Sequence, residues 1–272
     1  MKKRVVSAAI MVAIVIVLFV LPTSIAKYAI AVVVGILGAL AYKETLGLTK
    51  SHKEYPKAII AIGFISMELM IFNRLNPMYL HYGPSLGIIG IIMLLTLIPA
   101  IFYKKDKYTT KDAFYLLGTI LLIGLFFNAL MLLFIENKWL LLYLVLVATM
   151  TDTFAMLIGC LIGKHKLIPD VSPKKSVEGS VAGLIVATAI SSIYYINILD
   201  SGINIILLIS MTAVLSILGQ IGDLFFSKMK RENDVKDFSN LMPGHGGILD
   251  RFDSLVFIIL GYVIIFHILL LI

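Results

Sequence analysis

The chain has 272 residues, of which 60% are hydrophobic and 14% are charged, and its mean hydropathy is +1.01. Soluble globular proteins average about half apolar and about a quarter charged residues, so this composition excludes that class and predicts an integral membrane protein. The net charge of +7 does not indicate a nucleic-acid partner, because basic cytoplasmic loops are expected in any membrane protein. The single cysteine, Cys160, excludes an internal disulfide.

Nine apolar runs approach the roughly 20 residues that cross a hydrocarbon core. They cover residues 5–21, 25–42, 57–73, 84–103, 113–135, 138–162, 180–198, 202–226 and 249–272. Their length favours helices over barrel strands, which alternate over about ten residues. We therefore expect an all-α fold, a polytopic integral membrane protein with about nine transmembrane helices. Residues 1–135 would form the N-terminal spans, and residues 136–272 a C-terminal region with the candidate catalytic residues and cytoplasmic loops at 163–179 and 227–249.

The basic residues predict an orientation, because Lys and Arg beside spans stay preferentially in the cytoplasm. With the N-terminus inside, all of the 23 basic residues except Lys27, Arg74 and Lys138 fall on the cytoplasmic side. This predicts a multi-pass protein of the cell membrane, plasma or inner, with a cytoplasmic N-terminus and an external C-terminus. The first residues resemble a secretory signal peptide. Its removal would disturb the alternation of loop charge, so we expect it to remain as the first span.

Three carboxylates lie within apolar runs, where ionisable groups are costly and usually face a cavity. Glu68 either faces such a cavity or lies at the membrane interface, and the sequence favours the interface. Asp152 lies inside the predicted span 138–162, which favours a cavity-lining role. Asp223 shares one helical stripe with Gln220, Ser227 and Lys230, spaced three or four residues apart. A solvated helix end could give the same stripe, but some twenty mainly apolar residues precede Asp223.

The loop after this stripe carries a phosphate-and-metal pattern. Asp250 and Asp253 share a helix face, and they follow Gly246 and Gly247. Glycines let backbone N–H groups approach phosphate closely. Carboxylates suit Mg²⁺, which is commonly held by one or two of them together with substrate phosphates. If the folded loop brings Asp223 and Asp250 together, it creates a divalent-metal site at the cytoplasmic mouth.

A second basic segment, Ser172-Pro173-Lys174-Lys175-Ser176, has two adjacent ammonium groups flanked by hydroxyls. Such lysines can act as point charges for phosphate, although a topology-determining loop would explain the lysines alone. The chain has no nucleophile elbow, Walker A loop or zinc spacing. The residues therefore predict phosphoryl or nucleotidyl transfer by positioning and charge stabilisation, assisted by a metal.

These residues resemble a known family. The pattern of Ser227, Lys230-Arg231, Lys236-Asp237 and the segment from Pro243 to Asp253 is similar to the signature of the phosphatidate cytidylyltransferases, also called CDP-diacylglycerol synthases. Asp152, Gly163-Lys164-His165, residues 172–176 and Glu178-Gly179 resemble the segment that precedes it in that family. Ser176 stands where the family more often has threonine. The motifs cover about residues 150 to 253, whereas the first half matches only in hydropathy and length.

The resemblance implies that CTP reacts with phosphatidic acid to give pyrophosphate and CDP-diacylglycerol. It also implies dependence on Mg²⁺, with room for a second cation, and a homodimer in the lipid bilayer. We assign catalytic roles to Asp223, Asp250, Lys230, Arg231 and Asp253, with Asp223 and Asp250 as the metal ligands. We assign substrate binding to Asp152, Ser172, Lys174, Lys175, Ser176, Ser227, Lys236, Asp237, His245, Gly246, Gly247 and Arg251.

Two alternative functions fit parts of the pattern. Another CTP-dependent lipid enzyme, such as a polyprenol or phytol kinase, would also bring a nucleotide to a lipid. An ion-coupled transporter would also use intramembrane acids and glycine-interrupted helices. The dense charge of the 227–249 loop disfavours the transporter, because a permeation path needs polar groups distributed across the bilayer.

Overall fold

The computed structural model describes residues 12–50, 54–73, 86–199, 202–242, 244 and 246–271. The chain divides into two compact units. The first unit consists of Met1–Ile135 and Asp237–Asp250, and the second of Glu136–Lys236 and Arg251–Ile272. The loop that precedes the last helix therefore clusters with the N-terminal helices.

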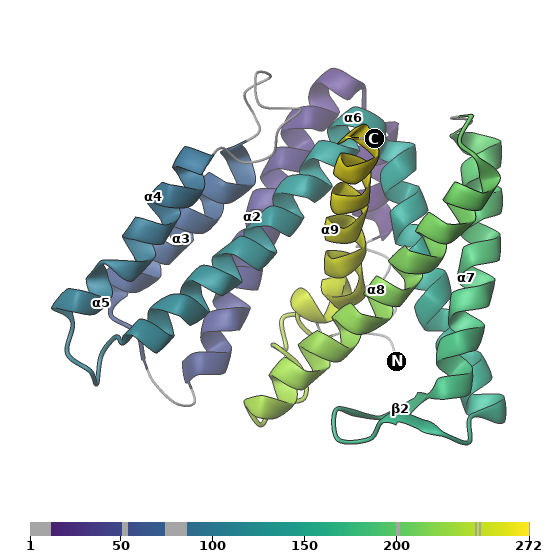
Figure 1. The fold of residues 1–272 in the computed structure, drawn as a ribbon. Coiled ribbons are helices and arrows are strands. Elements are labelled where there is room, and N and C mark those ends of the chain that lie inside the picture. Colours follow the sequence, from purple (N-terminus) through teal and green to yellow (C-terminus); the bar gives the residue numbers. More distant parts are fainter. Residues whose placement is uncertain are drawn as a thin grey trace. The chain divides into compact units, whose positions relative to one another are not determined.

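The first unit is a set of packed helices (Figure 1). It holds a helix over residues 12–20, α2 (Thr23–Lys50), α3 (Lys57–Phe72), α4 (Leu86–Leu97), α5 (Pro99–Phe102) and the first part of α6 (Thr110–Ile162). Helix α3 packs against both α2 and α4. The buried Asn128 of α6 donates its Nδ2 hydrogen to the carbonyl of Ile71 at 2.8 Å. Such an interhelical hydrogen bond satisfies a polar side chain that hydrocarbon would penalise.

Helix α6 is 53 residues long and is interrupted at one position. Asn137 has φ −153° and ψ 92°, which is not helical. Its Oδ1 accepts hydrogen bonds from the backbone N–H groups of Trp139 and Leu140 at 3.1 and 3.2 Å. Asn137 therefore caps the second part of α6 as an N-cap residue would. The kink falls between the two predicted spans 113–135 and 138–162.

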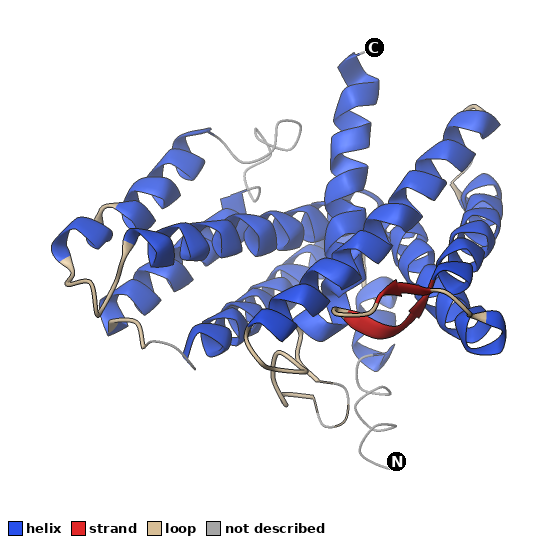
Figure 2. Ribbon diagram, turned by 60° about the horizontal axis from the view of Figure 1, so that its bottom comes forward, coloured by secondary structure: helices blue, strands red, loops and turns tan. Residues whose placement is uncertain are grey.

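The second unit contains the rest of α6, a β-hairpin and three long helices. The strands are β1 (Lys166–Ile168) and β2 (Ser172–Ser176), paired antiparallel with Lys166 opposite Ser176. The helices are α7 (Val177–Ile198), α8 (Ile205–Glu232) and α9 (Leu249–Leu271), whose first two residues belong to the first unit. Figure 2 shows the hairpin, which the sequence predicted only as a loop. Helix α7 starts directly after β2 because the Ser176 hydroxyl accepts a hydrogen bond from the Gly179 N–H at 3.2 Å.

Glycines and hydroxyl groups hold the second unit together. Helix α7 packs against α8, and a Cβ on Gly183 would lie 2.9 Å from the Cβ of Ala155 in α6. Small residues of this kind let membrane helices approach closely. In the same unit, the hydroxyls of Thr151 and Ser216 are 2.8 Å apart and both residues are buried.

An all-α membrane fold is confirmed, whereas the count of nine spans is not. Within the described residues, five helices are long and apolar enough to cross a membrane: Thr23–Leu48, Thr110–Ile162, Val177–Ile198, Ile205–Glu232 and Leu249–Leu269. The difference has four sources. The predicted first span, 5–21, lies partly outside the described residues, and its described helix covers only residues 12–20. Helix α3 has 16 residues, the apolar run at 84–103 is divided into α4 and α5 before Pro99, and α6 unites two predicted spans.

Candidate active site

The predicted stripe on α8 is built around Asp223. One turn further along the helix, the hydroxyl of Ser227 donates to Asp223 Oδ1 at 3.2 Å. One turn earlier, Gln220 exchanges two hydrogen bonds with Ser180 of α7, one with its hydroxyl and one with its carbonyl at 3.3 Å. Residues three or four apart on a helix share one face. The stripe is therefore joined to α7 at one end and presents a carboxylate next to it.

The other oxygen of Asp223 is paired with a lysine from the hairpin. Lys175 Nζ, carried by β2, lies 2.5 Å from Asp223 Oδ2. The two side chains are 27% and 23% exposed, so water screens the pair only in part. The neighbouring Lys174 is exposed. The structure thus distinguishes the two adjacent lysines, which the sequence could not.

Two further carboxylates belong to the same unit. The hydroxyl of Ser254 in α9 donates to Asp152 Oδ2 in α6 at 2.9 Å. The backbone N–H of Ser254 donates to Asp253 Oδ1 at 2.8 Å. Electrostatic interactions connect Asp152 with Asp223 and Lys175, and they connect Asp253 with Asp223, Asp152 and Lys230. We call Asp152, Lys175, Asp223, Ser227, Lys230, Asp253 and Ser254 the polar cluster.

A glycine allows α8 and α9 to approach each other at this cluster. A Cβ on Gly222 would lie 2.7 Å from the carbonyl oxygen of Asp253 and 3.0 Å from the Cβ of Phe257. Any larger residue would push the two helices apart beside Asp223. The sequence did not assign a role to Gly222, although it directly precedes the aspartate.

The basic residues at the end of α8 have different environments. Lys230 is only 7% exposed although it carries a charge. Arg231 is exposed, and its guanidinium donates to the carbonyl of Val235 at 3.0 Å, in the turn that follows the helix. Burial of a lysine is costly unless other groups compensate its charge. Lys230 is therefore the better placed of the two to act on a group bound at the polar cluster.

The donor set of the polar cluster fits Mg²⁺ completed by a substrate. Within the described part of the chain, no group of three or more His, Cys, Asp or Glu side chains is arranged to hold a metal by itself. Mg²⁺ is commonly held by one or two carboxylates with substrate phosphates and water. Asp152, Asp223 and Asp253 carry carboxylate oxygens of the type that Mg²⁺ prefers, so the residue types of the polar cluster are compatible with a metal completed by substrate phosphates and water.

The second predicted metal ligand, Asp250, belongs to the first unit. Its Oδ2 accepts hydrogen bonds from the backbone N–H groups of Phe238 and Gly247 at 2.9 and 2.8 Å. We call residues 237–250 the glycine loop. Gly246 has a φ of +81°, and its carbonyl accepts a hydrogen bond from Met242 N at 2.9 Å. In this turn the Gly247 N–H is directed at Asp250. The joint ligation of a metal by Asp223 and Asp250 stays a prediction.

A buried carboxylate that the sequence interpretation did not consider also contacts the glycine loop. Glu44 of α2 is 4% exposed. It accepts hydrogen bonds from the hydroxyl of Ser239 at 2.7 Å, from Ile248 N at 2.8 Å and from Leu249 N at 2.9 Å. The available signal was an acid next to an apolar run. Its partners lie about 200 residues away, so the sequence alone could not identify them.

The remaining predicted site residues are dispersed or have structural uses. Ser176 caps α7, and Ser172 opens β2. Lys236, Asp237 and Arg251 are exposed, the first two in the connection after α8 and the third in the first turn of α9. His245 and Pro243 lie outside the described residues. These substrate-binding assignments stay predictions.

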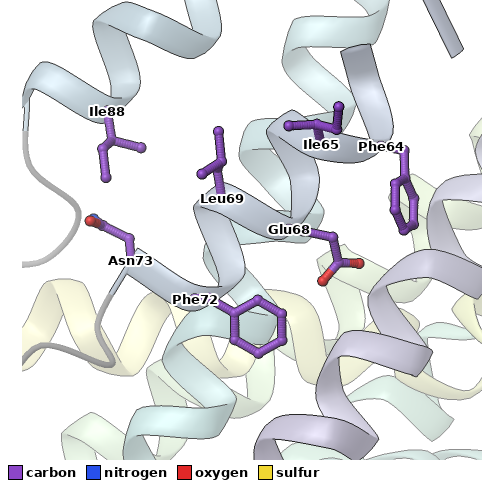
Figure 3. Close-up of a pocket in the computed structure, with 7 residues that line it drawn as sticks. All are labelled: Phe64, Ile65, Glu68, Leu69, Phe72, Asn73 and Ile88. Carbon is purple, nitrogen blue, oxygen red and sulfur yellow. The ribbon is translucent and has the colours of Figure 1, made fainter. Parts of the chain in front are cut away.

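Glu68 lines a cavity, which was the first of the two alternatives that the sequence left open; the second was a position at the membrane interface. The cavity has a volume of about 330 Å³ and lies in the first unit, with Phe64, Ile65, Leu69, Phe72, Asn73 and Ile88 as its other lining residues (Figure 3). Its walls are mainly apolar, and Glu68 Oε1 is buried without a hydrogen-bond partner among the described residues. None of the assigned catalytic or substrate-binding residues lines it.

Known proteins resemble the chain over most of its length. It matches the model of the cytidylyltransferase family over residues 2–269. It is 34% identical over 231 residues to a phosphatidate cytidylyltransferase of Staphylococcus aureus (strain COL), covering 82% of this chain and 84% of the relative. A relative of that name in Bacillus subtilis (strain 168) is 32% identical over 242 residues, covering 85% and 86%. One in Staphylococcus saprophyticus is 42% identical over 156 residues, covering 57% and 60%.

Proposed function

The chain belongs to the cytidylyltransferase family, and on that premise we propose how its residues transfer the cytidylyl group of CTP to phosphatidate. The reaction releases pyrophosphate and leaves CDP-diacylglycerol, which serves phospholipid biosynthesis. The observation that carries the proposal is the polar cluster, in which Lys175 and Lys230 accompany three aspartates within one unit. Both substrates are phosphates, and a cluster of mixed charge next to apolar helices can accept them from water and from lipid.

The chemical step requires one bond to form and one to break. An oxygen of the phosphatidate phosphate attacks the α-phosphorus of CTP, and the bond to the pyrophosphate leaving group breaks in line with it. The attacking oxygen is already ionised at neutral pH, because a phosphate monoester has its second pKa near 6. The protein therefore needs no strong general base, and its contribution is positioning and charge stabilisation.

The lysines of the cluster bind phosphate oxygens. Lys175 exchanges its partner Asp223 for a substrate phosphate. Its side chain is partly exposed and can therefore reach a bound phosphate. The buried Lys230 supplies a second positive charge from α8. Lys174, Arg231 and Arg251 are exposed and contribute to the approach of the anionic nucleotide. The lipid tails remain among the apolar helices.

The carboxylates provide the metal ligands. Mg²⁺ would neutralise charge on the phosphates and orient them for in-line attack. Asp223 and Asp250 remain our proposed ligands, because each places a carboxylate in or beside the signature segment. Asp152 and Asp253 interact electrostatically with Asp223, and a cation bound among these carboxylates would offset their mutual repulsion. A second cation could be accommodated by the same acids.

The membrane arrangement extends the proposal. A multi-pass protein with its N-terminus and active site in the cytoplasm would meet CTP on the side where basic residues predominate. We assign the cell membrane, plasma or inner, as its location and a homodimer as its assembly. Cysteine-accessibility labelling in oriented vesicles tests the orientation, and the mass of the detergent-solubilised protein tests the dimer.

One assay tests the reaction. Purified protein is incubated with phosphatidic acid micelles, labelled CTP and Mg²⁺, and the products are extracted into organic solvent. A labelled CDP-lipid is expected. A phosphorylated alcohol formed from a supplied polyprenol or phytol, without a CDP-lipid, would indicate a lipid kinase. Solute flux in vesicles without consumption of CTP would indicate a transporter.

A further inference from the structure

We infer that Glu44 is a positioning residue for this reaction, which it serves by holding the glycine loop in the arrangement that turnover requires. The inference rests on the proposed function, because it assigns Glu44 a part in presenting Asp250. Its three hydrogen bonds lie inside the first unit. Three observations lead to it: the burial of Glu44, the identity of the atoms it binds and the space around Gly247.

Burial makes Glu44 an expensive residue to keep. Its exposed fraction is 4%, and a buried carboxylate destabilises a fold unless hydrogen bonds compensate for its lost hydration. Three donors do so, and all come from the glycine loop: one hydroxyl and two backbone N–H groups. Removing the carboxylate would therefore leave buried N–H donors without an acceptor. This destabilises the fold more than removing both partners of a hydrogen bond would.

The two backbone donors belong to the junction at which α9 begins. Ile248 N–H bonds to one oxygen of Glu44 and Leu249 N–H to the other. The first N–H groups of a helix have no partner within the helix and carry a partial positive charge. A side chain from α2 thus supplies the capping that normally comes from the residue preceding a helix. This fixes where α9 starts, one residue before Asp250.

Two carboxylates share three consecutive amides of the loop. Gly247 N–H donates to Asp250, and the next two N–H groups donate to Glu44. The backbone from Gly247 to Leu249 is therefore held by two side chains. Any movement of this segment away from Glu44 also strains the hydrogen bond that orients the Asp250 carboxylate. Glu44 acts on the proposed metal ligand through the backbone and without touching it.

Gly247 has no space for a side chain because it lies against Glu44. A Cβ at this position would be 2.5 Å from Glu44 Oε1 and 2.7 Å from its carboxyl carbon. The glycine thus permits the close approach of loop and carboxylate. The contact explains the residue type at Gly247 without invoking a phosphate.

The test combines kinetics with a label on the loop. Exposed Cys160 is replaced by Ala, and Leu241→Cys supplies an attachment point for a nitroxide on an exposed residue of the glycine loop. Glu44→Gln is then introduced, which replaces one acceptor oxygen by an NH₂ group facing a backbone donor. We expect a more mobile electron paramagnetic resonance spectrum in vesicles and a fall in kcat of about 10²-fold, with little change in KM for CTP. Glu44→Asp, which keeps the charge, should recover part of both.

Matched controls separate positioning from general damage. Glu54→Gln makes the same change at an exposed acid of the first unit and should alter neither readout. A label at Asp106→Cys, in the turn between α5 and α6, should not respond to Glu44→Gln. If Glu44→Gln does not yield folded protein, Ser239→Ala removes one of the three hydrogen bonds of Glu44 and also the acceptor of the Leu241 N–H, whereas Ser239→Thr retains the hydroxyl for both. In this pair kcat is the deciding readout, because a label at Leu241→Cys would also respond to the loss of the second bond. The alanine variant should then loosen the loop and lower kcat more than the threonine variant.

Each outcome decides the inference. An unchanged loop spectrum overturns it, and so does a loosened loop with wild-type kcat, because Glu44 would then be a structural tie without effect on turnover. If the unsubstituted protein forms no CDP-lipid, the proposed function fails. The role of Glu44 in catalysis then falls with it, while the spectrum still reports whether Glu44 holds the loop.

Discussion

The polar cluster and the glycine loop use carboxylates in different ways. In the polar cluster, Asp223 binds the ammonium of Lys175 and the hydroxyl of Ser227. At the glycine loop, Glu44 of α2 and Asp250 accept hydrogen bonds mainly from backbone N–H groups. A side-chain partner can rotate towards an arriving phosphate, whereas a backbone partner fixes the path of the chain. We therefore propose that the first group takes part in the chemistry and that Glu44 maintains the geometry that the chemistry needs, while Asp250 has both uses.

The largest expected effect concerns Asp223. Asp223→Asn retains the shape of the side chain but removes the charge that pairs with Lys175 and is proposed to bind Mg²⁺. We expect a loss of CTP turnover of at least about 10³-fold, measured as labelled lipid, with the protein still eluting as a folded species in detergent. Asp234→Asn is the matched control, because Asp234 is exposed and has a φ of +55°, which asparagine tolerates. Wild-type activity of Asp223→Asn would refute the metal assignment.

Asp250 combines two roles: it holds backbone N–H groups of the glycine loop, and it is a proposed metal ligand. Both of its backbone hydrogen bonds end on Oδ2, so the single amide oxygen of Asp250→Asn can keep them, whereas Asp250→Ala cannot. We expect both variants to lose turnover by about 10²- to 10³-fold, and only the alanine variant to mobilise a label at Leu241→Cys. An active asparagine variant would show that Asp250 serves the loop alone and is not a metal ligand.

The two adjacent lysines of β2 provide a matched pair. Lys175→Gln removes the partner of Asp223, whereas Lys174→Gln changes an exposed residue. We expect kcat/KM to fall about 10²-fold for Lys175→Gln and only a few-fold for Lys174→Gln. The activity of the Lys174→Gln variant should depend less on added salt than that of the wild type, because the variant lacks an exposed charge that salt would screen. Equal losses would mean that the pair acts only as a diffuse positive surface.

The smallest effect is expected from the helix contact at Gly222. Gly222→Ala places a methyl group against Asp253 and Phe257, and such overpacking costs about 1–3 kcal/mol of stability. We expect a lower thermal midpoint in detergent and a decrease in turnover of about 10-fold. A Cβ at Gly118 in α6 would meet no atom within 4 Å, so Gly118→Ala should not lower the midpoint. Identical behaviour of the two variants would contradict the close approach of α8 and α9.

The sequence by itself determined the class and the family of the protein, and it predicted the residues of the reaction. Apolar runs predict helices because a bilayer leaves no other partner for backbone N–H and C=O groups than the helix itself. The boundary near Asn137 followed from the charged and amide residues between two such runs. The stripe from Gln220 to Ser227 followed from helical spacing, which α8 retains. The signature segment indicated the cytidylyltransferase family, and the relatives confirm it.

Only the tertiary structure decided which of these residues meet. The pairing of Lys175 rather than Lys174 with Asp223 depends on the register of the β-hairpin. The amino-acid composition of the segment does not determine that register. The contact between Glu44 and the start of α9 joins residues about 200 positions apart, and no local pattern announces such a pair. Hydropathy reports how much of a helix is apolar, but the direction of one buried carboxylate is fixed by the backbone donors that the fold brings to it.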